Sequence, residues 1–219
     1  MLSPKSDFGD QLNAWGEKCG RIFPWRKTNN LFHIFLAEVL LHRTRAENVV
    51  PVYQKLIKEF PSIHEMSKLD EKTPLYILSS LGLKWRTEML LKSVRTIERD
   101  FGGYIPNDKQ KLLSLPGIGD YIASAIRVFS ANTEDPLIDT NTVRVISRVY
   151  GFKATDSTRR SKSIRSRYLE LRNNKDPRNF AFSMIDLAAL ICKPSLPDCL
   201  HCPVEKHCIT GCRKKGLGD

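Results

Sequence analysis

The sequence predicts an all-α protein from two observations. Apolar residues recur at helical spacing in several segments, and no pair of alternating polar and apolar runs is joined by a hairpin turn. A sheet is therefore not expected. The predicted helices cover Phe32 to Leu41, Val49 to Phe60, Pro74 to Ser80, Arg86 to Phe101 and Tyr121 to Ala131.

Prolines and glycines separate these helices, because proline lacks the N–H that a helix interior needs and glycine weakens a helix. Pro74 follows Thr73 and suits the first turn of a helix. Asn107 or Asp108 can cap a short helix that runs through Leu113. The separating positions are Pro24, Pro51, Pro61, Pro74, Gly82, Gly102, Gly103, Pro106, Pro116 and Pro136.

The charge of the chain favours a polyanionic partner. Among the 219 residues, 35 are Lys or Arg and 24 are Asp or Glu, which gives a formal charge of +11. The surplus is concentrated, since residues 144–178 hold eleven Lys and Arg against three acidic residues. A local basic surface of this kind is typical of nucleic-acid binding, because bound cations release counterions from phosphates.

Composition also indicates where the protein works. The N-terminal residues lack the apolar core of a signal peptide, and no stretch approaches the roughly 18 apolar residues of a membrane-spanning helix. Six cysteines, four of them clustered, suit an intracellular metal site better than a disulfide framework. We expect an intracellular protein, cytoplasmic or nucleoid-associated, with no membrane partner.

The segment Leu115-Pro116-Gly117-Ile118-Gly119-Asp120-Tyr121 predicts a tight turn between two helices. Glycine at 117 and 119 permits positive φ and lets the backbone approach a ligand without a Cβ in the way. The helix that begins near Asp120 presents its first N–H groups to a phosphate oxygen. With the basic surplus, this turn is interpreted as a DNA-binding site, and Ile118 at its tip packs against the turn or along a sugar.

Two carboxylates are candidates for chemistry. Asp139 follows the second of these helices in the segment Leu137-Ile138-Asp139-Thr140-Asn141, where it can stabilise positive charge at a reacting centre or simply cap the next helix. Glu38 interrupts the apolar segment Leu36 to Leu41, where burial would raise its pKa and allow proton donation.

Four cysteines near the C-terminus have the spacing of a metal site, namely Cys192, Cys199, Cys202 and Cys208. Four thiolates hold either a tetrahedral zinc ion or a [4Fe–4S] cluster, and the residues alone leave both open. His201 and His207 lie within the same loop and are possible competing ligands.

The segments LPGIGDY-IASA and IDTNTVRVISR together resemble the helix–hairpin–helix and catalytic aspartate of the DNA glycosylase superfamily typified by endonuclease III. The resemblance extends from Phe23-Pro24-Trp25-Arg26 to the last cysteine and includes the cysteine spacing. It implies a [4Fe–4S] cluster on Cys192, Cys199, Cys202 and Cys208. It also implies two helical domains with a DNA cleft between them.

The expected domains follow from this resemblance. Residues 31–135 would form a six-helix barrel that contains the helix–hairpin–helix at about 108–131. Residues 1–30 and 136–219 would form the iron–sulfur domain, with the cluster loop at 192–208. Glu38 and Tyr121 would then face Asp139 across the cleft.

The same resemblance assigns the chemistry. Asp139 matches the superfamily's catalytic aspartate, which stabilises the deoxyribose cation after the base has been flipped out. Members that also cleave the strand have a lysine after the position of Asp120, and this chain has Tyr121, which cannot form a Schiff base. A monofunctional glycosylase that leaves an abasic site is therefore predicted, with Glu38 as proton donor or water activator.

The target base is predicted from the segment His42-Arg43-Thr44, which looks like that of the archaeal G·T mismatch thymine glycosylases. Adenine mismatch enzymes tend to have a glutamine before the threonine, a tyrosine pair after the position of Gly82, and a second recognition domain beyond the cluster. Further expected DNA contacts are Lys84, Arg86 and Arg144. We expect a monomer that acts on double-stranded DNA carrying thymine or uracil opposite guanine.

Three alternatives remain open. An adenine glycosylase acting opposite guanine or 8-oxoguanine is favoured by Glu38, since a purine nitrogen accepts a proton and thymine offers no equivalent. A thymine-glycol-type lyase would break the strand itself. A non-catalytic DNA-binding module with a structural metal would keep the turn and the cysteines and have no use for Glu38, Tyr121 and Asp139.

Overall fold

The computed structural model describes residues 5–70, 84–173 and 175–214, except for the side chains of 84, 86 and 212–214. Every regular element among these residues is a helix, which confirms the predicted all-α class. The chain divides into two compact units, Ile22–Ala131 and the combination of Met1–Arg21 with Asn132–Asp219. We call them the hairpin unit and the cysteine unit.

The unit boundaries fall close to, but not at, the positions 31 and 135 expected from the sequence. Residues 22–30 belong to the hairpin unit, because Trp25 is buried there, stacked on Phe23 at 5.0 Å and edge-on to Tyr53 at 5.3 Å. Aromatic contacts of this geometry add to the free energy gained from burial.

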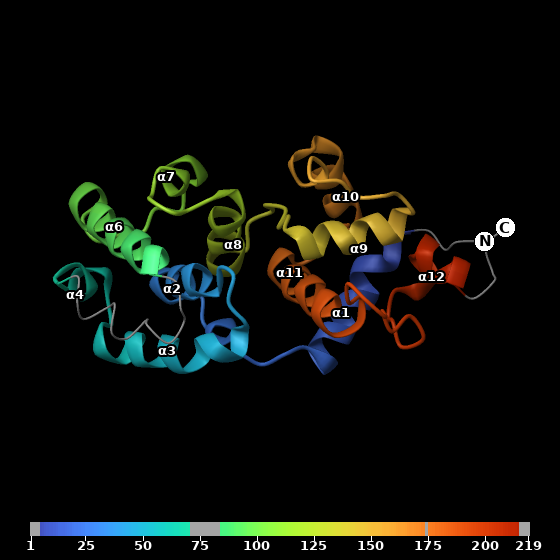
Figure 1. Ribbon diagram of the computed structural model, residues 1–219, viewed down its shortest axis with the longest axis horizontal. Coiled ribbons are helices and arrows are strands. Elements are labelled where there is room, and N and C mark those ends of the chain that lie inside the picture. Colours follow the sequence, from blue (N-terminus) through green and yellow to red (C-terminus); the bar gives the residue numbers. More distant parts are fainter. Residues whose placement is uncertain (1–4, 71–83, 174, 215–219) are drawn as a thin grey trace. The chain divides into compact units, whose positions relative to one another are not determined.

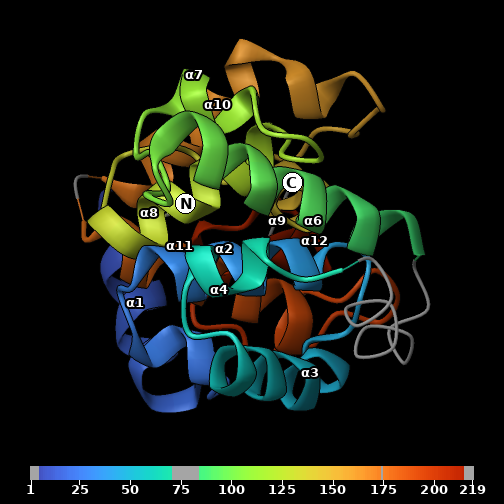
Figure 2. The same ribbon diagram turned by 90° about the vertical axis from the view of Figure 1, so that its left-hand side faces the viewer.

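The hairpin unit is built around one nearly all-apolar helix, α2 (Leu31–Leu41), which packs against α3, α6 and α8 (Figure 1). Figure 2 shows α3 and α6 on opposite sides of α2. Because a helix that is apolar all round must be covered on every side, α2 fixes the centre of this unit. Its elements are η2 (Pro24–Lys27), α2 (Leu31–Leu41), α3 (Ala46–Glu59), α4 (Ile63–Ser67), α6 (Lys84–Phe101), α7 (Lys109–Leu113) and α8 (Asp120–Ala131).

Four of the five helices predicted from apolar spacing are present as α2, α3, α6 and α8. The fifth, Pro74 to Ser80, lies outside the described residues. Pro51 was wrongly placed between helices, since α3 begins at Ala46 and includes it. Pro51 is exposed and close to the start of the helix, so the carbonyl left without a helical N–H partner is reached by water and the cost of proline is small.

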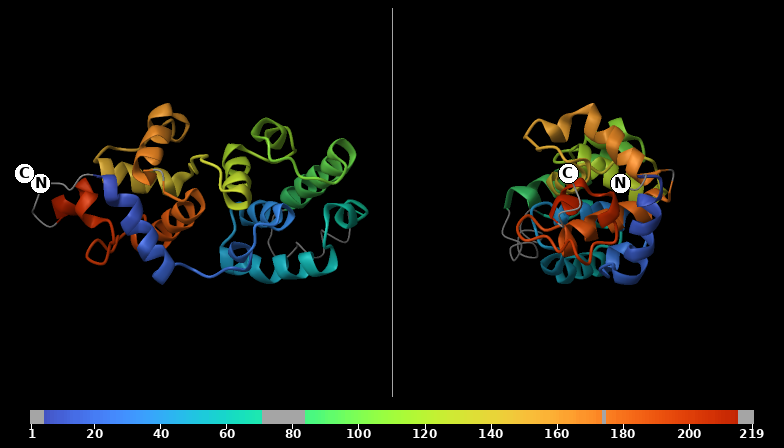
Figure 3. Two further views of the ribbon diagram at one scale, coloured as in Figure 1. Left: turned by 180° about the vertical axis from the view of Figure 1, so that it is seen from behind. Right: turned by 90° about the vertical axis from the view of Figure 1, so that its right-hand side faces the viewer.

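The cysteine unit brings the two ends of the sequence together. Helix α1 packs along α11, and α12 packs against α9 (Figure 3). The unit's elements are η1 (Lys5–Asp7), α1 (Phe8–Cys19), α9 (Thr140–Tyr150), η4 (Thr158–Arg160), α10 (Lys162–Arg172), α11 (Pro177–Asp186), the π-helix η5 (Leu187–Ile191), η6 (Glu205–His207) and α12 (Ile209–Lys214).

A buried ion pair joins the first helix to the approach to the cysteines. Asp186 is 1% exposed, and its two oxygens accept hydrogen bonds from the Nε and the backbone N of Arg21 at 2.7 and 2.9 Å. The sequence analysis did not find this partner, because the two residues are 165 positions apart. A carboxylate this deep requires such compensation to remain charged.

No helix in the described part of the chain is both long and apolar enough to cross a bilayer.

Candidate functional site

The predicted glycine turn joins two helices of the hairpin unit. The side chain of Asp108 caps α7 by accepting from the backbone N of Lys111 at 2.9 Å. The turn that follows is held from outside by Ser93 of α6, whose Oγ donates to the carbonyl of Pro116 at 2.5 Å. The chain then reverses at Gly117, and α8 begins at Asp120.

The two glycines of the turn meet different surroundings. Gly117 has φ +77°, and a Cβ built there would lie 2.9 Å from the Cβ of Met89. Gly119 would meet nothing within 4 Å, so its face is open. Ile118 is 6% exposed and therefore packs into the turn rather than standing in solvent. The positive end of the α8 dipole thus emerges at a surface with no side chain on Gly119 to obstruct a phosphate.

Tyr121 is half-buried in the first turn of α8. Lys109, in the hairpin, is engaged in the fold: its Nζ lies 3.1 Å from Oδ1 of Asp120 and donates to Oγ of Ser124 at 2.9 Å. An amine held by these two partners is not free to approach a sugar carbon.

Glu38 is buried in the middle of α2, as the sequence predicted. It is 7% exposed, and burial raises the pKa of its carboxyl to about 8, although the charge of Arg26 acts in the opposite direction. The carboxyl is therefore protonated at neutral pH and can donate a hydrogen bond or a proton. Asn30 fixes the start of this helix by accepting from the backbone N of His33 at 3.1 Å.

The segment after α2 presents polar side chains at the surface. Arg43 is exposed and has φ +59°, a left-handed conformation that costs a non-glycine residue about 1–3 kcal/mol. His42, also exposed, contacts Trp85 edge-on at 5.6 Å, and Thr44 is half-buried. The side chains of Lys84 and Arg86, predicted as DNA contacts, lie outside the described residues.

Asp139 lies in the cysteine unit, immediately before α9. Its Oδ1 accepts from the backbone N of Thr142 at 2.7 Å, and its Oδ2 accepts from Nδ2 of Asn141 at 2.8 Å. Both oxygens are thus fixed while the group remains half-exposed. The capping role that the sequence allowed is present, and it leaves the remaining lone pairs of the carboxylate available to a substrate.

The guanidinium of Arg144, for which a DNA contact stays a prediction, has three hydrogen-bond acceptors inside the fold. Nε donates to the carbonyl of Cys192 at 2.9 Å, NH2 to that of Ala188 at 3.0 Å, and NH1 to Oδ1 of Asn141 at 2.8 Å. The carbonyl of Ala188 is accessible because it belongs to the π-helix η5, where hydrogen bonding shifts by one residue. A continuous chain of hydrogen bonds therefore runs from Asp139 to the first cysteine.

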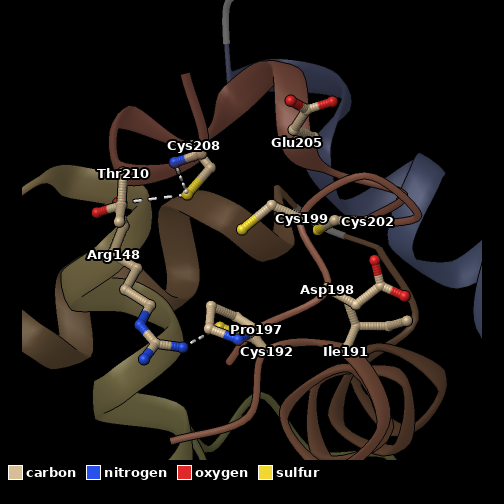
Figure 4. Close-up of a pocket in the computed structure, with 11 residues that line it drawn as sticks. Arg148, Ile191, Cys192, Pro197, Asp198, Cys199, Cys202, Glu205, Cys208 and Thr210 are labelled. Carbon is tan, nitrogen blue, oxygen red and sulfur yellow. Dashed lines mark hydrogen bonds between the residues drawn. The ribbon is translucent and has the colours of Figure 1, made fainter. Parts of the chain in front are cut away.

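The four predicted cysteines line one cavity of about 350 Å³ of space, part of it open to solvent. Figure 4 shows the side chains of Cys199 and Cys208 directed into it. Arg148 closes one side: its NH1 donates to Sγ of Cys192 at 3.2 Å and to the carbonyl of Lys193 at 2.7 Å. Neither histidine of the loop is among the residues that line the cavity.

The loop histidines have structural partners of their own. His207 is fully buried, with Nε2 3.3 Å from Oε1 of Gln11 and 3.4 Å from Oδ1 of Asp7. His201 is exposed and lies 2.9 Å from Asp198. These contacts direct both imidazoles to protein partners, whereas the four cysteines line the cavity together with Asp198 and Glu205.

The four cysteines are the residues of this cavity that could hold a metal group. Within the described residues, no three His, Cys, Asp or Glu side chains are grouped closely enough to hold one metal ion. Burial raises the pKa of the Cys202 thiol to about 12. Four thiols around one cavity can serve as ligands to a zinc ion or to an iron–sulfur cluster once they are deprotonated.

Three residues of these sites were not predicted from the sequence. They are Arg26 beside Glu38, Asn141 beside Asp139, and Arg148 beside Cys192. Arg148 had a usable signal, since it follows Arg144 by four positions and so lies on the same face of α9. Arg26 gave none, because its proximity to Glu38 depends on how η2 packs against α2.

The fold and these residues define an all-helical protein built around a helix–hairpin–helix. A family model described as "HhH-GPD superfamily base excision DNA repair protein" matches residues 36–170. The chain belongs to this superfamily.

The chain is similar to named members of the family. A thymine-DNA glycosylase of Aeropyrum pernix is 34% identical over 192 residues, which cover 85% of each chain. An adenine DNA glycosylase of Buchnera aphidicola is 32% identical over 95% of this chain and 60% of its own length. The solved structure of a thermostable thymine-DNA glycosylase superposes with a TM-score of 0.89, at 27% identity, over 96% of this chain and 97% of that one.

Substitutions at the two hairpin glycines should change two different properties, the stability of the fold at Gly117 and the affinity for DNA at Gly119. Gly117→Ala should lower the free energy of unfolding by about 1–3 kcal/mol, because it combines positive φ with a contact on Met89. Gly119→Ala should leave stability nearly unchanged and weaken DNA binding, because its methyl group occupies the open face. Urea unfolding and fluorescence anisotropy with duplex DNA measure the two effects. If Gly119→Ala binds DNA as tightly as wild type, the turn is not the phosphate site.

Glu38 should make stability depend on pH. The folded protein retains a proton on Glu38 up to about pH 8, whereas the unfolded chain loses it above about 4.5. Stability from this group is therefore complete below about pH 4.5 and falls as pH rises toward 8, by at most about 1.4 kcal/mol per pH unit. Glu38→Gln mimics the protonated form, so the variant should gain stability over wild type between pH 5 and 8 in urea unfolding.

The exposed Glu47 supplies the matched control for that measurement. Glu47→Gln should change the free energy of unfolding by the same small amount at pH 5 and at pH 8. A Glu38→Gln variant that behaves like Glu47→Gln would contradict the assignment of a buried, protonated carboxyl at position 38.

Proposed function

We propose that the protein is a monofunctional DNA glycosylase that removes thymine or uracil opposite guanine and leaves an abasic site. Asp139, Glu38 and Tyr121 are the proposed catalytic residues, and the hairpin glycines with Ile118, His42, Arg43 and Thr44 form the proposed DNA-binding surface. The enzyme would act as a monomer on mismatched double-stranded DNA.

The observation that carries the proposal is the contrast between two carboxyls. Glu38 is buried with a pKa raised to about 8, whereas Asp139 is half-exposed and accepts two hydrogen bonds. Environments that differ in this way assign different roles to chemically similar groups, one as acid and one as stabilising anion.

The proposed reaction uses both roles. The bond between C1′ and the base nitrogen breaks, and positive charge develops on the deoxyribose, where the fixed carboxylate of Asp139 stabilises it. The oxygen of a water molecule then forms a bond to C1′, and the departing base takes up a proton. Glu38 can supply that proton or hydrogen-bond to a carbonyl of the leaving base.

Tyr121 supports hydrolysis without strand cleavage. A phenol forms no imine with the opened sugar, and Lys109, the hairpin's nearby amine, is held by Asp120 and Ser124. The product expected from this site is therefore an intact strand with an abasic position.

The choice of thymine and uracil is supported by the relatives and by Arg43. The thymine-DNA glycosylase of Aeropyrum pernix covers 85% of the chain. The strained, exposed Arg43 is the kind of residue that a fold retains for a ligand. Its guanidinium suits the O6 and N7 acceptors of the guanine opposite the excised base.

A single-turnover assay tests the function. End-labelled duplexes with one G·T, G·U, G·A or 8-oxoguanine·A pair are incubated with excess protein and analysed before and after alkali. Breakage at T or U that appears only after alkali is the expected result. Breakage before alkali would contradict the monofunctional reaction, and no breakage with any duplex would contradict the glycosylase proposal.

An adenine glycosylase is the second candidate, favoured by the protonated Glu38, because adenine has ring nitrogens that accept a proton during departure. The Buchnera aphidicola relative shows that the adenine enzymes are similar to this chain as well. Alkali-dependent breakage only at A in the same assay would establish this alternative and overturn the role given to Arg43.

Asp139→Asn should separate catalysis from folding. Asparagine still caps α9 through its oxygen, so fold and DNA affinity should persist, while loss of the negative charge should lower the single-turnover rate by at least about 10²-fold. Asp176→Asn is a matched control, because Asp176 caps α11 through Asn179 N at 2.6 Å and accepts from Asn132 Nδ2 at 2.9 Å. A fully active Asp139→Asn enzyme would contradict the catalytic assignment.

We also propose that Cys192, Cys199, Cys202 and Cys208 hold a [4Fe–4S] cluster. The group would crosslink the loop from η5 to α12 and position it, and no hydrolytic step requires it. The support is the shared cavity of the four cysteines and their spacing in the sequence, which resembles that of the iron–sulfur glycosylases.

Purified protein should be brown and contain iron and acid-labile sulfide in equal amounts. Cys199→Ser should lower both, because it removes one ligand, whereas Cys19→Ser should not, because Cys19 is an exposed thiol on α1, outside the pocket lining. Metal analysis and visible absorption provide the measurement. Colourless protein with stoichiometric zinc would contradict the iron–sulfur proposal.

A further inference from the structure

A strongly basic surface lies in the cysteine unit, apart from the residues assigned so far. Residues 153–167 contain six Lys and Arg and one acidic residue, Asp156. Lys153, Arg159, Arg160 and Lys162 are exposed, and no carboxylate of the described residues pairs with any of them. We call these four residues the basic face. Because uncompensated cations repel one another, the arrangement favours an anionic partner over a merely solvated surface.

Hydroxyl groups hold this segment in one conformation. Thr158 Oγ1 accepts from the backbone N of Thr155 at 2.9 Å, and Ser161 Oγ donates to the carbonyl of Thr158 at 2.9 Å. Ser161 also caps α10 by accepting from the backbone N of Ile164 at 3.2 Å. The cations of η4 and the start of α10 are therefore presented by an ordered turn rather than by a free chain.

The opposite side of α10 is buried close to Asp139. Ile164, Tyr168 and Leu171 are each at most 1% exposed. The Tyr168 phenol hydrogen-bonds the backbone of Leu137, two residues before Asp139, and is within electrostatic range of the Asp139 charge. One helix therefore connects the basic face to the segment that carries the proposed catalytic carboxylate.

The dimensions of a helix set the distance between the two features. An α-helix with its side chains is about 10–12 Å across, and each strand of DNA rises about 3.4 Å per nucleotide. For a duplex that runs across α10, the far side of the helix therefore lies about three nucleotides from the one that reacts at Asp139.

We propose that the basic face binds backbone phosphates of the duplex about three base pairs to one side of the reacting nucleotide. This inference rests on the proposed function, which places the reacting nucleotide at Asp139. The contact is independent of base sequence, so it holds matched and mismatched duplexes alike and adds to the affinity given by the hairpin.

The test is the salt dependence of binding to an undamaged 30-base-pair duplex, measured by fluorescence anisotropy. The variant Arg159→Gln, Arg160→Gln, Lys162→Gln should bind more weakly, and the slope of log K against log salt should be shallower than wild type by up to about 2.7, since each lost phosphate contact contributes about 0.9. Circular dichroism and the thermal midpoint verify that the variant is folded.

The matched control removes the same charge elsewhere. Lys55, Lys58 and Lys68 are exposed on and beside α3 and α4 in the hairpin unit. Lys55→Gln, Lys58→Gln, Lys68→Gln should retain the wild-type slope, because a change in overall charge alone releases no additional counterions at a contact. Equal slopes in the two triple variants would overturn the proposal.

Trimming the duplex tests the position of the contact. With a mismatch near one end, wild type and the basic-face variant should bind equally once fewer than about three base pairs remain on the side that the face covers. A difference that survives trimming on either side would overturn the placement. These binding measurements use no base release, so they are decided separately from the glycosylase assay.

Discussion

The guanidinium of Arg144 is the interaction on which the rest of the cysteine unit depends. Its three nitrogens join Asn141 at the head of α9 to the carbonyls of Ala188 and Cys192. Burial lowers the pKa of Arg144, and the three acceptors offset part of the cost of removing its guanidinium from water. The carboxylate of Asp139 and the first cysteine are thereby fixed relative to one helix. A displacement of the cysteine loop would therefore change the position of Asp139 through the hydrogen bonds of Arg144 and Asn141.

The hairpin unit depends on a different constraint, the complete burial of α2. The packing of α2 leaves Glu38 7% exposed, and it also brings α8, the second helix of the hairpin, against α2. The raised pKa of Glu38 is a consequence of this burial rather than of any neighbouring anion. The buried acid and the position of α8 are thus products of one packing arrangement.

The sequence was sufficient where the signal is local. The helical class, the glycine turn, the cap at Asp108, the apolar surroundings of Glu38 and the four cysteines of the pocket all follow from short spacings. It does not show where two distant segments meet, as in the pairing of Arg21 with Asp186 and the hydrogen bonds of Arg144 inside the fold. Two of the three acceptors of Arg144 lie 44 and 48 positions away, beyond the reach of any local pattern. Pro51 was misplaced because exposure, which the sequence does not show, decides how much proline costs.

Capping and catalysis make compatible demands on Asp139. A cap requires an acceptor oxygen directed at the first turn of α9, which asparagine also provides, whereas stabilisation of a sugar cation requires negative charge. The two hydrogen bonds to Asp139 hold both oxygens in place and leave half the group exposed. Serine or threonine would satisfy the helix equally well. The helix therefore does not by itself require the negative charge of Asp139, which the proposed catalytic role would use, and the helix terminus fixes the orientation of that charge.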